Sequence, residues 1–337
     1  MRCLKRWEWS DDMIFTESML EQYSAPLSAT EDQMCKNAIG MVRDALKPLG
    51  FTDDGKEIKT LYSDTYAYSV EIKSVSGNRR VKLFVQGSYA NNTNVKTQSD
   101  VDIAVVQEEV FRTHYRSSQY YPQSDADYGF TTAPAATKTF KDEVQECLER
   151  KFGRDVERKN KSIKVHGNTY RKDADTVPSL RYRDYSGDYS KDASNYVGGI
   201  VIFPDDNSGI IINYPEQHIY NGKQKNVATH YHYKKMVRII KKMRYLMQEY
   251  YYPEADKVNS FALESLLWNI PDDYYLEYGQ YRKVFLFSRI ISYLRAHYNE
   301  YDKYFEANGI KKLFPNENAR KNMIAFIDGL NAFYEYK

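Results

Sequence analysis

The sequence has few of the residues that mark secreted, zinc-binding or membrane proteins. Its 337 residues include three cysteines, Cys3, Cys35 and Cys147, which lie far apart and form no C-x-x-C pair. A disulfide framework or a zinc ribbon is therefore not expected, and a reducing cytoplasm fits. No apolar run reaches about 18 residues, and no signal-peptide pattern follows Met1. We expect a cytoplasmic protein without a membrane partner.

An excess of charge of either sign is also missing. Lys and Arg total 48 against 46 Asp and Glu, which gives a formal net charge of +2. Proteins whose main task is to grip duplex DNA usually carry a strong basic excess, so duplex DNA is not an expected partner. A chain of 337 residues is too long for one simple core and suits two lobes.

The stretch over residues 83–106 carries the chemistry. Its first apolar run is broken by Gly87-Ser88, and its second contains Asp100 and Asp102. Residues i and i+2 of a strand point to the same face, so the two acids are expected side by side. Two acids on a strand otherwise built for burial are costly unless a cation neutralises them. Hard oxygen ligands of this kind suit Mg²⁺.

Gly87-Ser88 predicts a phosphate cradle at the end of the first strand. Backbone N–H groups at the start of a helix attract anions, and glycine lets the backbone approach a ligand closely. The alternative is a simple turn before an edge strand whose acids are solvated. The apolar residues around Asp100 and Asp102 disfavour that alternative.

Taken together, Gly87-Ser88, the twelve-residue step to Asp100, and Asp100-Val101-Asp102 resemble the signature of the DNA polymerase β-like nucleotidyltransferase superfamily. The flanking segments resemble the bacterial cGAS/DncV-like nucleotidyltransferases of anti-phage signalling (CBASS), which make cyclic di- or trinucleotides. The resemblance covers roughly residues 30 to 270. It implies a two-lobed α+β fold, with a mixed sheet that carries the acids and a helical lobe that closes over the nucleotide.

Residues 173–178, DADTVP, resemble the strand that carries the third carboxylate of the family, where an Asp stands three residues before a Pro. This match implies Asp175 as the third metal ligand. The alternative is that Asp173 also faces the site, because it too lies two residues from Asp175. Pro178 is expected at the end of a strand, at the margin of the sheet.

Residues 229–248 have a helical period, and the resemblance places a nucleotide contact there. The expected apolar stripe consists of Tyr233, Met236, Ile240, Met243 and Met247. The basic residues off this stripe predict a solvated face: Lys234, Lys235, Lys241, Lys242 and Arg244. Among them, the resemblance implies that Lys241 contacts the triphosphate of the nucleotide.

Ser260-Phe261 opens the next predicted helix, nineteen residues after Lys241. The resemblance implies a second triphosphate contact by Ser260 and base stacking by Phe261. Serine at a helix start is also a capping residue, so Ser260 is compatible with both roles.

The remaining pattern predicts three regions: an N-terminal helical brace over 1–55, a catalytic lobe over 56–215 and a helical lobe over 216–337. A capping box at Ser28 and Glu31 predicts the start of a helix that ends before Pro48 and Gly50. The other expected elements are a helix over 11–22, strands over 60–74, 81–86 and 162–166, an irregular segment over 108–136, a helix over 137–152, a hairpin over 198–214, and helices over 280–298 and 316–334.

The resemblance implies that a ribose hydroxyl attacks the α-phosphate of a nucleoside triphosphate. Two Mg²⁺ ions, with Mn²⁺ as a substitute, would be bound by Asp100, Asp102 and Asp175. The implied partners are nucleoside triphosphates, an effector protein that senses the product, and regulatory proteins. Two alternatives stay open: a nucleotidyltransferase that modifies a drug, protein or RNA end, and a catalytically silent nucleotide-binding regulator. The presence of all three carboxylates disfavours the silent regulator.

Overall fold

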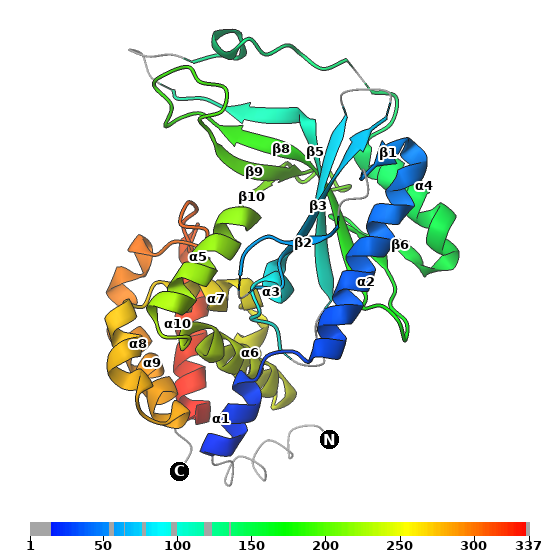
Figure 1. The fold of residues 1–337 in the computed structure, drawn as a ribbon. Helices are drawn as coiled ribbons and strands as arrows, with labels where there is room; N and C mark the ends of the chain where they lie inside the picture. Colours follow the sequence, from blue (N-terminus) through cyan, green and yellow to red (C-terminus); the bar gives the residue numbers. More distant parts are fainter. Residues whose placement is uncertain are drawn as a thin grey trace. The chain divides into compact units, whose positions relative to one another are not determined.

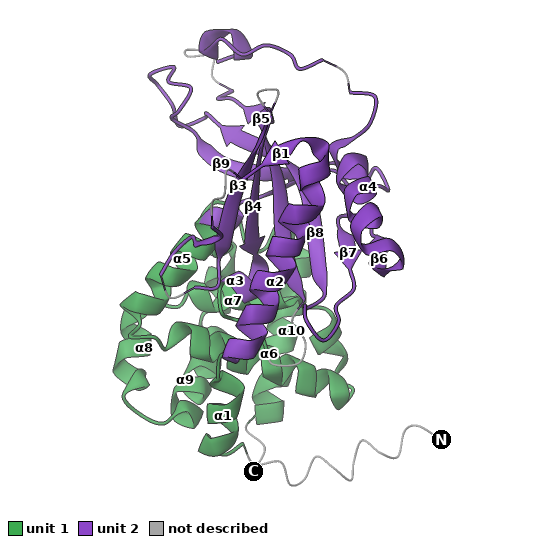
Figure 2. Ribbon diagram, turned by 45° about the vertical axis from the view of Figure 1, so that its right-hand side comes forward, with its two compact units in different colours: residues 1–27, 91–98, 217–337 green, residues 28–90, 99–216 purple. Residues whose placement is uncertain are grey.

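The structure is a computed structural model that describes residues 15–53, 57–63, 65–75, 79–95, 100–117, 123–134 and 136–334. The chain forms two compact units, coloured separately in Figure 2. Residues 28–90 and 99–216 form the sheet unit, and residues 1–27, 91–98 and 217–337 form the helical unit. The boundary between the two units falls between residues 27 and 28, inside the region predicted over 1–55, and the division into three regions stays a prediction.

The sheet unit is built on a mixed sheet with ten strands among the described residues, in the order β1-β3-β4-β5-β8-β7-β6, with β2 on β3 and β9-β10 on β8. β5 and β8 are parallel, and the other pairs are antiparallel. The strands are β1 (Phe51–Thr52), β2 (Lys59–Thr60), β3 (Tyr68–Ser74), β4 (Arg80–Gln86), β5 (Val101–His114), β6 (Val156–Arg158), β7 (Ile163–Val165), β8 (Ala174–Asp184), β9 (Val197–Ile202) and β10 (Ile211–Asn213).

Helices α2 (Ala29–Leu46) and α4 (Phe140–Phe152) pack against each other and against the strands, as Figure 1 shows. The predicted capping box is confirmed: the Ser28 hydroxyl accepts from the Glu31 N–H, and the Glu31 carboxylate accepts from the Ser28 N–H. The chain leaves α2 through a 3₁₀ helix (Lys47–Leu49) that ends at Gly50, whose φ is +84°. The short helix α3 (Gly87–Ala90) follows β4 directly.

The alternation of side chains along β5 separates its two faces. Ala104 and Val106 belong to a buried cluster on one face, and Asp102 shares that face because strand side chains alternate. The cluster consists of Phe84, Ala104, Val106, Val177, Ile200 and Ile202. The central strands thus carry an apolar face that ends in a carboxylate.

Several boundaries differ from the sequence prediction. β5 continues to His114, and a 3₁₀ helix forms over Asp125–Tyr128. The prediction of an irregular segment over 108–136 is therefore partly wrong. β3 covers only the second half of the strand predicted over 60–74. A second short 3₁₀ helix, Gly153–Asp155, follows α4.

Pro178 was predicted at the end of a strand, but it lies inside β8, opposite Val105 of β5. On its other edge, β8 pairs with β7 over residues 174–176 and with β9 over residues 180–184. Pro178 falls in the gap between these two partners, so its missing N–H costs no hydrogen bond on that edge.

The helical unit contains α1 (Glu17–Ser24), most of α5 (Pro215–Ala228), α6 (Tyr233–Glu249), α7 (Ser260–Trp268), α8 (Asp272–Gly279), α9 (Lys283–Ala296) and α10 (Glu317–Tyr334), with 3₁₀ helices over Pro253–Asp256 and Tyr298–Lys303. The helix predicted over 11–22 lies partly outside the described residues, and α1 begins only after Thr16, whose hydroxyl accepts from the Met19 N–H. The sequence prediction did not include α5 and α8.

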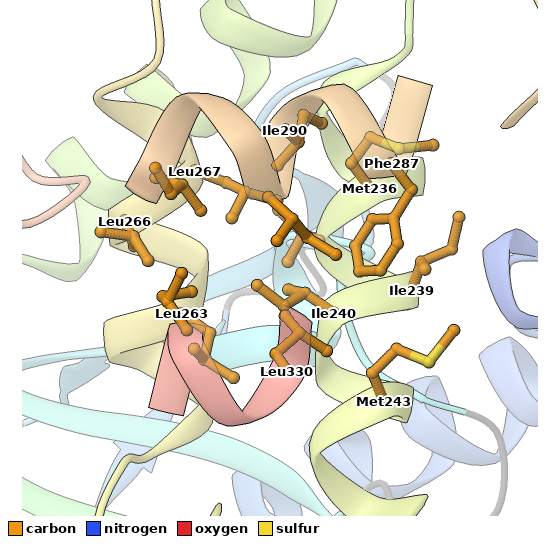
Figure 3. Close-up of a cluster of buried hydrophobic side chains, with 14 of the residues drawn as sticks. Met236, Ile239, Ile240, Met243, Leu263, Leu266, Leu267, Phe287, Ile290 and Leu330 are labelled. Carbon is orange, nitrogen blue, oxygen red and sulfur yellow. The ribbon is translucent and has the colours of Figure 1, made fainter. Parts of the chain in front are cut away.

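The core of this unit is an apolar cluster to which α6, α7, α9 and α10 contribute (Figure 3). All five residues of the predicted α6 stripe are fully buried, which confirms the stripe. The prediction that the basic residues form a solvated face is wrong at two positions, because Lys234 and Lys241 are only 3% and 2% exposed. None of the helices in the described part of the chain has the length and apolar character needed to cross a bilayer.

Candidate active site

The register of the sheet places two of the predicted ligands side by side. Asp102 of β5 is the direct partner of Asp175 in parallel β8, and on its other side it is the partner of Gln86 in β4. Side chains of directly paired residues emerge on the same face. Two carboxylates that are 73 positions apart in the sequence therefore meet on one face of the sheet.

Gly87 lies against the Asp102 carboxylate. Its φ is +71°, and a β-carbon at this position would lie 2.3 Å from Oδ2 of Asp102. Only glycine fits, because any side chain would displace the carboxylate and would also strain the backbone. Ser88 follows as the second residue of α3. A phosphate cradle formed by Gly87 and Ser88 stays a prediction.

The Asp102 carboxylate is electrostatically unfavourable as it stands. Burial raises its pKa to about 7, with further contributions from the charges of Asp175 and Asp100. Among the described residues, the Asp102 carboxylate has no hydrogen-bond donor and no cationic partner. A carboxylate in this position is stabilised either by a proton or by a cation.

The other acids have cationic neighbours. Lys164 of β7 lies 3.0 Å from Oδ2 of Asp100 and 2.6 Å from Oδ2 of Asp173. Partial burial acts to raise the pKa of Asp173, but Lys164 and the Gly167 N–H hold it below its ordinary value. Asp175 has weaker contacts, a 3.4 Å hydrogen bond from Ser162 and Lys159 at 3.7 Å.

The donor set fits Mg²⁺ in chemistry, since it offers carboxylate oxygens and includes one acid without a cationic neighbour. Among the described residues, no three His, Cys, Asp or Glu side chains form a group that could hold a metal ion. Asp100 is paired with Lys164 instead. The sequence prediction missed Lys164, although a lysine between the buried Ile163 and Val165 of a short strand was a usable signal.

The predicted nucleotide contacts of the helical unit have different environments. Lys241 is buried in an ion pair with Glu264, 2.7 Å from its Oε2. Ser260 does not cap α7, contrary to one of its predicted roles, because the N-cap is Asn259, whose side chain accepts from the Ala262 N–H. Ser260 is the first residue of the helix, and Phe261 is 37% exposed.

Comparison with known proteins identifies the family. Residues 220–335 match the model for the cGAS/DncV-like nucleotidyltransferase C-terminal helical domain, and residues 71–176 match that for the nucleotidyltransferase domain. The cyclic GMP-AMP synthase of Staphylococcus schleiferi is 41% identical over 325 residues, which are 96% of this chain and 98% of that relative. The chain belongs to the cGAS/DncV-like nucleotidyltransferases.

Solved structures of similar nucleotidyltransferases match nearly the whole chain. The Rhodothermus marinus c-UMP-AMP synthase, solved with Apcpp and Upnpp, has a TM-score of 0.71 and 26% identity and covers 94% of this chain and 96% of its own. The Elizabethkingia meningoseptica cyclic dinucleotide synthase, solved with GTP and Apcpp, has a TM-score of 0.66 and 29% identity, with 93% and 97% covered. The predicted family and α+β fold are confirmed.

Proposed function

We propose that this nucleotidyltransferase joins nucleoside triphosphates into a cyclic di- or trinucleotide without a nucleic-acid template. The observation that carries the proposal is the 41% identity to a cyclic GMP-AMP synthase along nearly the whole of both chains. The near-zero net charge also supports it, since a long template or RNA acceptor would need a basic surface.

In the proposed reaction, a ribose hydroxyl of one nucleotide attacks the α-phosphorus of another. The new bond joins the hydroxyl oxygen to phosphorus, the bond to the β-phosphate oxygen breaks, and diphosphate leaves. The proton of the attacking hydroxyl is lost in this step. A second transfer, from the linear product back onto itself, closes the ring.

Asp100, Asp102 and Asp175 would hold two Mg²⁺ ions, with Mn²⁺ as a substitute. When bound, these ions would stabilise the attacking and leaving oxygens of an in-line displacement. The pairing of Asp102 with Asp175 across β5 and β8 supports this assignment, as does the absence of a cation beside Asp102 among the described residues. Asp100 would have to exchange Lys164 for the metal.

The remaining residues in this proposal bind the nucleotide. Ser88, Lys241 and Ser260 would hold the β- and γ-phosphates, for which a lysine serves as a compact charge. Gly87 would let the backbone approach the phosphates closely. Phe261, which is partly exposed, would stack on a base.

We further propose that the enzyme acts in the bacterial cytoplasm in anti-phage signalling, where an effector protein senses its product. This proposal rests on membership of the family and on two relatives whose names record cyclic dinucleotide products. Those names give different bases, GMP-AMP in one and UMP-AMP in the other. All four ribonucleoside triphosphates therefore belong in the test.

The test is incubation of the purified protein with all four triphosphates and Mg²⁺ or Mn²⁺, followed by phosphatase and mass spectrometry. A cyclic product has no terminal phosphate, so it should survive phosphatase. Asp102→Asn serves as the inactive control. Complete conversion to nucleosides and inorganic phosphate would contradict oligonucleotide synthesis, and linear products with free hydroxyl ends would contradict cyclisation. Transfer only to an added drug, protein or RNA would favour the alternative enzyme class.

A further inference from the structure

A buried polar network in the helical unit is centred on Glu264, which is 1% exposed. Its Oε2 accepts a hydrogen bond from Lys241 at 2.7 Å and another from the Thr93 hydroxyl at 2.7 Å. Its Oε1 lies 2.8 Å from Nε2 of His218. The carboxylate thus collects three partners from three separate segments of the chain.

The same network extends to Phe261. The His218 ring packs edge-to-face against the Phe261 ring, with centroids 5.0 Å apart and planes at 81°. The side-chain amide nitrogen of Asn91 lies 3.3 Å from each of the two ring nitrogens of His218. Glu264 therefore contacts Lys241 directly and is connected to Phe261 through the His218 ring.

Opposite charges stabilise this arrangement. Burial acts to raise the pKa of Glu264, but the charge of Lys241 and the contact with His218 hold it below its ordinary range. Removing one partner of such a buried pair leaves an uncompensated charge, which is strongly unfavourable. Lys241 is 2% exposed, so its side chain is enclosed by its neighbours. Its position is set by Glu264 and Thr93.

We infer that Glu264 is a positioning residue for nucleotide binding, which orients the Lys241 ammonium directly and the Phe261 ring through His218. An ammonium group has three N–H donors. Glu264 and Thr93 take two of those of Lys241, which leaves the third for a phosphate oxygen. The inference rests on the proposed function, because it takes Lys241 and Phe261 as contacts to the triphosphate and the base.

The first test compares Glu264→Gln with the wild type in calorimetric titrations of a non-hydrolysable ATP analogue with Mg²⁺. The amide keeps the shape but loses the charge, so binding should weaken about tenfold or more, the value of one charged hydrogen bond. The KM for ATP should rise in parallel, while kcat stays within about threefold. Binding within about twofold of the wild type would overturn the inference.

A matched control is Asp272→Asn, which removes the counter-ion of Lys225, another mostly buried lysine of the helical unit. This change should lower the melting temperature without altering the affinity for the ATP analogue. An equal loss of affinity in Asp272→Asn would overturn the inference, because it would show that any lost counter-ion in this unit weakens nucleotide binding.

The double variant Lys241→Met with Glu264→Gln separates positioning from stability, and it also decides the question if Glu264→Gln alone does not fold. With both charges removed, the melting temperature should recover. Because Glu264 acts mainly through Lys241, the second change should cost little once Lys241 is gone, apart from the smaller effect that reaches Phe261 through His218. The inference would be overturned if Glu264→Gln weakened binding by the same factor in the Lys241→Met background as in the wild type, because Glu264 would then act independently of Lys241. A wild-type protein that binds the analogue but forms no oligonucleotide would contradict only the proposed function.

Discussion

The backbone of Gly87 approaches the Asp102 carboxylate so closely that a β-carbon on Gly87 would lie 2.3 Å from Oδ2. The turn that ends β4 and the acid of β5 are thus fitted to each other. The two residues are fifteen positions apart in the sequence, and their contact follows from the pairing of Gln86 with Asp102. The position of the carboxylate therefore depends on the size of residue 87.

Gly87→Ala should reduce nucleotidyl transfer by about tenfold or more, because the methyl group displaces the Asp102 carboxylate and disturbs a geometry on which two-metal catalysis depends. Gly50→Ala is the matched control. Gly50 also has a positive φ, +84°, but apart from its chain neighbours no atom of the described residues lies within 4 Å of the added β-carbon. Both variants should lose stability through backbone strain, and only Gly87→Ala should lose activity, measured as diphosphate release. Equal activities would show that the close approach is irrelevant to catalysis.

Asp102→Asn should remove turnover and also change how stability depends on pH. Because burial and neighbouring acids raise the pKa of Asp102 to about 7 from an ordinary value of 3.8, the folded protein retains a proton that the unfolded chain has lost. Between these two values the carboxylate therefore becomes progressively more destabilising as the pH rises. In EDTA, the melting temperature of Asp102→Asn relative to the wild type should increase from pH 5 to about pH 7 and then level off. A pH-independent difference would contradict the assigned shift.

Asp175→Asn and Asp173→Asn should behave differently, although the two acids lie two residues apart. Asp175 pairs with Asp102 in the sheet, whereas Asp173 is held by Lys164 and the Gly167 N–H. We expect Asp175→Asn to reduce kcat by at least about a hundredfold through lost metal stabilisation, and Asp173→Asn to keep most of the activity. Steady-state assays at saturating Mg²⁺ measure this. The reverse order would identify Asp173 as the third ligand.

Lys164→Met should lower the Mg²⁺ concentration that gives half-maximal activity. The lysine neutralises Asp100 and Asp173, so its removal leaves their negative charge to attract the metal and frees Asp100 from a competing partner. Lys161→Met is the control, because the exposed Lys161 lies just before the strand that carries Lys164 and makes no ion pair with these acids. A higher Mg²⁺ requirement in Lys164→Met would show that the ion pair supports the metal site instead of opposing it.

The sequence by itself determined the features that depend on near neighbours. The capping box at Ser28, the apolar stripe of α6 and the strand that carries Asp102 follow from local hydrogen bonds and from side-chain periodicity, which act over a few residues. The resemblance to the family rested on equally local patterns around Gly87 and Asp175. These patterns were sufficient for the family and the fold class.

Only the tertiary structure decided which charges meet. The pairing of Asp102 with Asp175, the ion pair of Lys164 with Asp100 and the burial of Lys241 against Glu264 join segments that are tens of residues apart. Periodicity placed Lys241 off the apolar stripe of its helix and therefore predicted solvent around it, but a lysine off the stripe can be buried when another segment supplies a counter-ion. That counter-ion is specified by the packing of α7 against α6, which no local pattern encodes.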